Sequence, residues 1–277
     1  MRLAISNIAW DVAEDKEIAQ LLHRYGIDAI DIAPGKYFPD PIQATAQDIA
    51  KVKTWWAECG VEITGIQALV FGTTGLNVFG SIEVQNAMLA HLSIICRIGG
   101  ALGARWLVFG SPKNRDRSGL NDQQTMDIAV DFFRRLGNIA ESHRVIVCLE
   151  PNPPCYGANF MVTSTETARV VNFIDHPAIR MQLDTGTLTI NGENVANVLG
   201  DYAQLIGHIH ASERDLLPLG DGETNHGKIC KAIEHYLPGY VVSIEMVATK
   251  NEPHVVSIER ALNTAVQNYR LPNESSR

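Results

Sequence analysis

Four side chains able to bind a metal ion follow one another along the second half of the chain, each at or near the end of a short apolar run. Glu150 closes VIVCLE, Asp184 closes IRMQLD and His210 closes LIGHIH. Glu245 comes late in YVVSIE. Three carboxylates and one imidazole suit a hard or borderline divalent ion, because oxygen-rich donor sets favour such metals. Mn²⁺, Mg²⁺ and Co²⁺ are the expected ions, with Zn²⁺ as a further candidate.

The joint pattern carries more weight than any one of these residues. A single acid at a strand end often only accepts hydrogen bonds from loop amides. Three acids at the ends of apolar strands would repel one another and lose hydration unless a cation or bound protons compensated them. We therefore expect one divalent ion per chain, held by Glu150, Asp184, His210 and Glu245.

The elements that position these side chains alternate regularly. Eight runs rich in Val, Ile and Leu predict strands, at Leu3–Trp10, Ile27–Ala33, Val61–Leu69, Arg105–Gly110, Val145–Glu150, Ile179–Asp184, Leu205–Ala211 and Tyr240–Val247. Helical spacing lies between them and after the last, near Lys16–Tyr25, Thr45–Cys59, Val84–Leu102, Gln123–Ser142, Ser164–Phe173, Val195–Tyr202, Gly227–Tyr236 and His254–Gln267. This order predicts a single α/β (β/α)8 TIM barrel, whose chemistry sits at the carboxyl ends of the strands.

The alternative fold is a doubly wound open sheet. The first strand-to-helix junction, SNIAWDVAED, has no glycine-rich phosphate-binding fingerprint, which disfavours it. A chain of 277 residues fits one barrel, and no linker-like change of composition interrupts it. We expect one barrel domain over residues 1–270 and a polar tail over 271–277.

The composition limits the classes of binding partner that we expect. With 23 basic and 31 acidic residues the formal net charge is −8, and no dense Lys/Arg block offsets it, so nucleic acid and anionic membranes are not expected partners. The 5 cysteines show no paired spacing, and no signal peptide or membrane span is evident, which predicts a reducing cytoplasm. A small carbohydrate is the expected partner, and a homo-oligomer is left open.

The runs LEPN, LDTG, HIHAS and SIE at successive strands resemble the xylose isomerase-like TIM barrel superfamily of sugar isomerases and epimerases. That group includes tagatose/psicose 3-epimerases, hydroxypyruvate isomerases and inosose dehydratases. The resemblance implies that Glu150, Asp184, His210 and Glu245 are the four metal ligands. It also implies that Glu150 and Glu245 are the acid/base pair of the 3-epimerase branch.

This chemistry moves a proton at a carbon beside a carbonyl, through an enediolate. A metal polarises the carbonyl, and a carboxylate takes the proton. Two glutamates on opposite faces of the substrate would give epimerisation, whereas one base acting on a shared face would give aldose–ketose isomerisation. The sequence leaves both open.

Further residues at the same end of the barrel are candidates for substrate binding. Lys113 in SPKNR could pair with a substrate carboxylate or phosphate, or be a solvated loop lysine. Asn152 could orient Glu150 as well as contact substrate. Thr187 stands where the family usually has a substrate-binding histidine. The remaining candidates for contacts to sugar hydroxyls are Glu213, Arg214 and Gln67.

Three other functions compete with a sugar isomerase or epimerase. A metal-dependent dehydratase of the inosose type begins with the same proton abstraction. An apurinic-site endonuclease of the same superfamily needs further histidines, but Gln67 and Thr187 occupy two of the relevant positions. A non-catalytic sugar-binding barrel is disfavoured, because binding alone gives no physical reason to keep mutually repelling acids.

Overall fold

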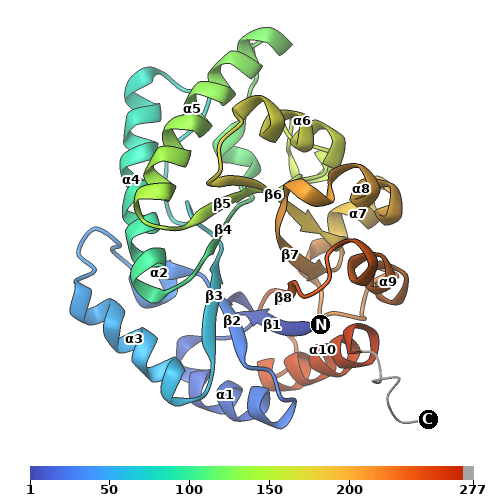
Figure 1. Ribbon diagram of the computed structural model, residues 1–277. Coiled ribbons are helices and arrows are strands. Elements are labelled where there is room, and N and C mark those ends of the chain that lie inside the picture. The colour runs from blue at the N-terminus through green and yellow to red at the C-terminus, as the bar shows by residue number, and fades with distance from the viewer. Residues whose placement is uncertain (271–277) are drawn as a thin grey trace.

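The computed structural model describes residues 1–270, and its eight strands form one closed parallel barrel in which each strand pairs with the next and β8 pairs with β1 (Figure 1). The strands are β1 (Arg2–Ser6), β2 (Ala29–Ile32), β3 (Glu62–Ile66), β4 (Trp106–Phe109), β5 (Ile146–Leu149), β6 (Ile179–Asp184), β7 (Ile206–Ser212) and β8 (Val241–Glu245). The predicted single (β/α)8 barrel is confirmed. Residues 271–277, the predicted polar tail, lie outside the described residues, and the division of the chain at 270 stays a prediction.

Helices surround the barrel, as Figure 1 shows. They are α1 (Asp15–Arg24), α2 (Pro34–Tyr37), α3 (Ala46–Glu58), α4 (Ile82–Leu102), α5 (Asp122–Ser142), α6 (Ser164–Ile174), α7 (Thr185–Asn191), α8 (Val195–Tyr202), α9 (His226–Tyr236) and α10 (His254–Tyr269). Polar side chains begin the longer ones: Thr45, Ser81 and Asn121 each accept a hydrogen bond from the first turn of α3, α4 and α5. The apolar stripe that helical spacing predicts packs inward, as Phe132, Phe133 and Leu136 of α5 do.

Six of the predicted strands end before their expected last residue, and the difference exceeds one residue in β1, β3 and β8; β3 stops at Ile66 rather than continuing to Leu69. β1 stops at Ser6, because the Ser6 hydroxyl accepts from the amide of Ile8 and starts a short 3₁₀ turn over Asn7–Ala9. β8 stops at Glu245 rather than continuing to Val247. The two short helices α2 and α7 were not predicted. α7 forms because Asp184, the last residue of β6, caps it by accepting from the amide of Thr187 at 2.7 Å.

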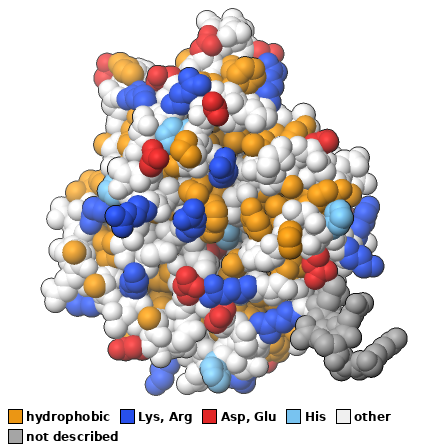
Figure 2. Space-filling view, in the orientation of Figure 1, with side chains coloured by type: hydrophobic (Ala, Val, Ile, Leu, Met, Phe, Trp, Pro, Cys, Tyr) orange, Lys and Arg blue, Asp and Glu red, His pale blue; other side chains and the backbone are white. Residues whose placement is uncertain are grey.

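The surface agrees with an acidic chain that has no basic block. Figure 2 shows positive and negative side chains interspersed with apolar ones over the face in view. Among the described residues, no helix combines the length and apolar character that crossing a lipid bilayer requires.

Candidate active site

The four predicted metal ligands come together at the carboxyl end of the barrel. One ligand atom from each of Glu150, Asp184, His210 and Glu245 lies within 4.8 Å of the others. His210 Nδ1 is 3.6 Å from Glu150 Oε1 and 3.3 Å from Glu245 Oε2. Parallel strands of a closed barrel explain this, since β5, β6, β7 and β8 present their carboxyl ends to one axis.

A neighbouring amide holds one oxygen of each glutamate. Asn152 Nδ2 donates to Glu150 Oε2 at 3.2 Å, and Gln67 Nε2 donates to Glu245 Oε1 at 2.7 Å. Glu150 Oε1 is buried and has no hydrogen-bond partner within residues 1–270. Gly110 leaves room for this carboxylate, because a Cβ there would collide with Glu150 Oε2. The glutamates are therefore oriented with their other oxygens toward the shared space.

Both carboxylate oxygens of Asp184 accept hydrogen bonds, whereas a neighbouring amide holds only one oxygen of each glutamate. Ser212 Oγ donates to Oδ2 of Asp184 at 2.6 Å, and the Thr187 amide donates to its Oδ1. Burial, followed by the charges of Glu150 and Glu245, raises the pKa of Asp184 to about 7, although these hydrogen bonds act to lower it. Without a cation, the site disfavours the charged form of this acid.

His210 is the only imidazole in the four-residue set and faces carboxylates on both sides. Burial alone would lower its pKa, but Glu245, Asp31 and Glu150 raise the pKa of His210 well above its usual value. Its Nδ1 faces the glutamates. Its Nε2 lies 3.7 Å from Asp31 Oδ2 and makes no hydrogen bond within the described part of the chain.

Asp31 on β2 supports this histidine from deeper in the barrel. It accepts from Thr64 Oγ1 at 3.0 Å and lies 2.7 Å from Nε2 of His208. Gly65 makes room for it, since a Cβ there would collide with Asp31 Oδ1. Despite burial, His208 and His210 hold the pKa of Asp31 well below its usual range. Asp31 therefore places a buried negative charge behind the ring of His210, 3.7 Å from its Nε2.

The residues present fit a divalent ion. Three carboxylates and an imidazole nitrogen supply hard donors within one cluster, and the unpartnered Glu150 Oε1 and the raised pKa of Asp184 are the marks of acids that lack a compensating charge. A cation would provide it.

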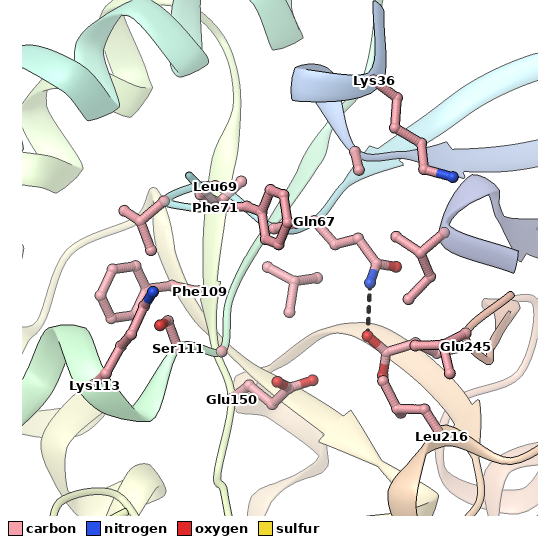
Figure 3. Close-up of a pocket in the computed structure, with 17 residues that line it drawn as sticks. Lys36, Gln67, Leu69, Phe71, Phe109, Ser111, Lys113, Glu150, Leu216 and Glu245 are labelled. Carbon is pink, nitrogen blue, oxygen red and sulfur yellow. Dashed lines mark hydrogen bonds between the residues drawn. The ribbon is translucent and has the colours of Figure 1, made fainter. Parts of the chain in front are cut away.

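Two adjoining hollows open over the cluster, and Glu150 and Glu245 line both. The first has a volume of about 450 Å³ and extends over Gln67, Phe71 and Lys113 (Figure 3). The second has a volume of about 430 Å³ and includes Asn152, Asp184 and Thr187. Figure 3 shows Glu150 and Glu245 beside the first hollow, together with the hydrogen bond from Gln67, which follows β3, to Glu245 on β8.

The predicted substrate-binding residues differ in which of the two hollows they line. Gln67 and Lys113 line the first hollow, the latter as an exposed side chain at its rim. Asn152 and Thr187 line the second. Arg214 is exposed and lines neither.

The carboxylate of Glu213 is engaged by its own loop, although the residue borders the second hollow. It accepts from the amides of Gly220 and Thr224, each at 3.0 Å, and lies 3.0 Å from Nε2 of His226. Despite burial, these partners lower the pKa of Glu213 to about 2. The geometry favours a role in holding the loop after β7 over contact with sugar hydroxyls.

Two buried charged residues were missed from the sequence. Asp31 sits in the apolar run AIDI, where an isolated acid is the available signal. Arg115 is fully buried, and its Nη2 donates to Asn152 Oδ1 at 2.9 Å. Burial lowers the pKa of Arg115 to about 10, partly offset by the charge of Glu150. Arg115 thus orients Asn152, which in turn holds Glu150, and nothing in SPKNR distinguished it from a surface arginine.

The chain belongs to the xylose isomerase-like TIM barrel family, whose sequence pattern matches residues 19–265. No functionally curated protein matches its sequence significantly.

Solved structures share the fold at low sequence identity. D-psicose 3-epimerase from Clostridium cellulolyticum H10, solved with D-tagatose, superposes with a TM-score of 0.80 at 17% identity, covering 97% of this chain and 99% of that one. The 3-keto-D-glucoside 4-epimerase of E. coli gives 0.77 at 19%, covering 95% and 98%. The IOLI protein, solved with a zinc atom, gives 0.74 at 18%, covering 97% and 98%.

Proposed function

We propose that the protein is a divalent-metal-dependent sugar epimerase or isomerase that transfers a proton at a carbon beside a carbonyl. The observation that carries the proposal is the pair Glu150 and Glu245, which line the same two hollows and are each held by an amide donor. The similarity to solved epimerases supports the substrate class, a small carbohydrate.

The two glutamates are the acid and the base. Each has one oxygen fixed by a neutral amide, which orients the carboxylate without neutralising its charge. Their strands, β5 and β8, are separated by β6 and β7 around the barrel, so the carboxylates reach a substrate between them from different directions. One takes the proton from one face of the carbon and the other returns a proton to the opposite face, which inverts that carbon.

The metal would be held by Glu150, Asp184, His210 and Glu245. When bound, a divalent ion supplies positive charge that would polarise a carbonyl oxygen, and this makes the hydrogen on the adjacent carbon more acidic. The protein's part is to orient the donors. Asp31 stands behind His210, and Ser212 and the Thr187 amide fix Asp184.

Solvent deuterium tests the proposal. The protein, supplied in turn with Mn²⁺, Mg²⁺, Co²⁺ and Zn²⁺, is incubated in D₂O with ketoses, aldoses, their phosphates, keto-glycosides and inososes, and followed by NMR. We expect deuterium at a carbon beside the carbonyl together with a new stereoisomer. Deuterium with loss of water would replace the epimerase by a dehydratase, and absence of exchange across the panel with every metal would leave a binding barrel.

Variants assign the roles. Glu150→Gln and Glu245→Gln keep the shape of the side chain and remove its basicity, so each should lower kcat about 10²–10⁴-fold. Lys113→Ala, at the exposed rim, is the control and should mainly change KM. Equal losses of kcat in all three would contradict the assignment of the glutamates as acid and base.

A further inference from the structure

The two hollows over the glutamates differ in chemistry. The second hollow is bordered mainly by polar residues, among them the exposed carboxylate of Asp215 and the hydroxyl of Tyr156, which accepts from the Asp215 amide and keeps its own proton to donate. The first is bordered mainly by apolar side chains, which include Leu69, Val70, Phe71, Leu216 and Val247. Because Glu150 and Glu245 line both, the acid/base pair stands at the junction of a polar and an apolar compartment.

The apolar side chains named above come from the three loops that follow β3, β7 and β8. Phe71 follows β3 and is 83% exposed, so its ring is available to a ligand. Val247 is 44% exposed, and its amide donates to the carbonyl of Leu216 at 3.0 Å, which joins the loops after β7 and β8 into one wall. Figure 3 shows Phe71 and Leu69 across the hollow from the two glutamates. Clustered exposed apolar side chains of this kind mark a binding surface.

A free monosaccharide does not match both compartments. Almost every carbon of such a sugar carries a hydroxyl, and a hydroxyl buried against an apolar wall without a partner is destabilising. The polar compartment offers partners for hydroxyls. The apolar one also contains Lys36, Ser111 and Lys113, but Lys36 Nζ already donates to the carbonyl of Asn7 and Ser111 Oγ to Asn114 Oδ1, and Lys113 lies exposed at the rim. The amide Nε2 of Gln67 is likewise bonded to Glu245. A ligand that fills both must have a hydroxylated part and an apolar part.

Building on the proposed function, we infer that the substrate is a keto-sugar glycoside with an apolar alkyl or aryl aglycone. The sugar ring occupies the polar compartment, and the aglycone lies against Phe71, Leu216 and Val247. The glycosidic bond blocks the anomeric carbon, so the carbonyl must be a ketone at another ring carbon. The step breaks one C–H bond beside that ketone and re-forms it on the opposite face, with no net oxidation.

This substrate fixes the class of the preceding reaction. A ring ketone in an intact glycoside arises by two-electron oxidation of a ring hydroxyl, with the glycosidic bond left in place. A dehydrogenase acting on glycosides must therefore supply the substrate. The inverted keto-glycoside produced here is in turn a substrate for reduction to a glycoside of changed configuration.

A ladder of aglycones tests the inference. The metal-loaded protein is given methyl, butyl and hexyl 3-keto-β-D-glucopyranosides in D₂O, and kcat/KM for deuterium exchange is measured for each. Burial of the chain should raise kcat/KM about two- to fourfold for each added methylene, mainly through KM. A ladder in which all three compounds react equally would overturn the inference and leave the proposed epimerase standing.

Phe71→Ala should remove most of the hexyl-to-methyl ratio, because it deletes the exposed ring of the apolar wall. The matched control is Phe173→Ala, another exposed phenylalanine, which lies on α6 and borders a different hollow. It should leave the ratio unchanged. An unaltered ratio in Phe71→Ala, or an equal loss in the control, would contradict the assignment.

Calorimetry distinguishes a failure of the proposed reaction from a failure of this inference, and sedimentation tests whether the apolar surface is instead an interface between copies of the chain. If no compound exchanges deuterium, but hexyl β-D-glucopyranoside binds more tightly than the methyl glycoside in calorimetry and Phe71→Ala abolishes the difference, the apolar compartment stands and the proposed reaction fails. Sedimentation gives the oligomeric state. A wild-type dimer that Phe71→Ala dissociates, together with a flat ladder, would make this surface an interface between copies and overturn the inference.

Discussion

Gln67 and Glu245 are joined across the mouth of the barrel: the Nε2 amide of Gln67, which follows β3, donates to Oε1 of Glu245, the last residue of β8, at 2.7 Å. The sequence predicted Gln67 as a contact to sugar hydroxyls. Its Oε1 is buried with no hydrogen-bond partner within residues 1–270, so that oxygen is the part of the amide left to meet a ligand. Gln67 thus positions the carboxylate proposed to exchange a proton.

Replacing Gln67 by Leu should lower kcat about 10–100-fold with a smaller change in KM, because the volume is kept and the donor to Glu245 is lost. Steady-state kinetics of deuterium exchange measure both parameters. Gln85→Leu is the matched control, since Gln85 is also buried but donates to the carbonyl of Gly80, away from the glutamates. A Gln67→Leu enzyme with wild-type kcat and raised KM would restore the role of sugar contact.

The acids of the site should make the metal-free protein less stable as the pH rises. Asp184 has a pKa of about 7 in the folded chain and about 4 when unfolded, so its folded form is favoured at low pH. This stabilising contribution is complete below pH 4 and is lost as the pH rises through 7. Asp184→Asn, neutral throughout, should therefore be more stable than metal-free wild type at pH 8 by at least about 1 kcal/mol, and the advantage should vanish near pH 4.

Bound metal should make wild type more stable than Asp184→Asn at pH 8, the reverse of the order expected without metal. Wild type should gain about 2.7 kcal/mol at a metal concentration of 100 times Kd, whereas Asp184→Asn should gain little. Thermal melts with and without Mn²⁺ at pH 5 and pH 8 measure both effects. A variant that is destabilised at pH 8 without metal, or stabilised by Mn²⁺ as much as wild type, would contradict the assignment of Asp184 as a ligand.

The fold was largely predictable because a barrel repeats one unit. Each strand is a short apolar run buried on both sides, and each helix has a stripe of apolar residues, so the eightfold alternation is visible without any long-range contact. The boundaries were less predictable. β8 ends at Glu245 although its apolar run reaches Val247, because backbone pairing and loop contacts decide where a strand stops.

The clustering of Glu150, Asp184, His210 and Glu245 was predictable for the same reason: they lie at or near the ends of successive strands, and their types match one chemistry. The residues that support them were not. Asp31 meets His208 only through pairing of distant parts of the chain across the closed barrel, and Arg115 reaches Asn152 between two neighbouring loops. Such contacts join residues that have no common spacing in the sequence.

Asp31→Asn should weaken metal binding about 10–100-fold while the fold is kept, because the amide is similar in shape and lacks the charge that faces His208 and His210. Calorimetric titration of the metal-free protein with Mn²⁺ gives the affinity directly, without any assay of activity. Asp15→Asn is the control: Asp15 is also buried, but it accepts from Trp10 and Tyr37 away from the site. Equal Kd values in wild type and Asp31→Asn would remove Asp31 from the support of the metal.

The hydroxyl of Thr187, a residue predicted to contact the substrate, already makes a hydrogen bond within the protein. Its Oγ1 donates to the carbonyl of Pro151 at 3.1 Å, while its amide donates to Asp184. Thr187→Val keeps the volume and should change kcat/KM little, at a cost in stability of about 1 kcal/mol for the lost hydrogen bond. We therefore expect this position to act through the space it leaves rather than through hydrogen bonding to the sugar.

Thr187→His tests that role, because an imidazole would fill part of the polar hollow that Thr187 borders. We expect kcat/KM for a keto-glycoside to fall at least about tenfold, since a side chain that overlaps the sugar ring misplaces the reacting carbon. Free ketohexoses, which are smaller, should be affected less. The backbone donor to Asp184 remains in the variant, so stabilisation by Mn²⁺ should be unchanged. Equal kinetics for wild type and Thr187→His on every substrate would show that this position does not limit the size of the substrate.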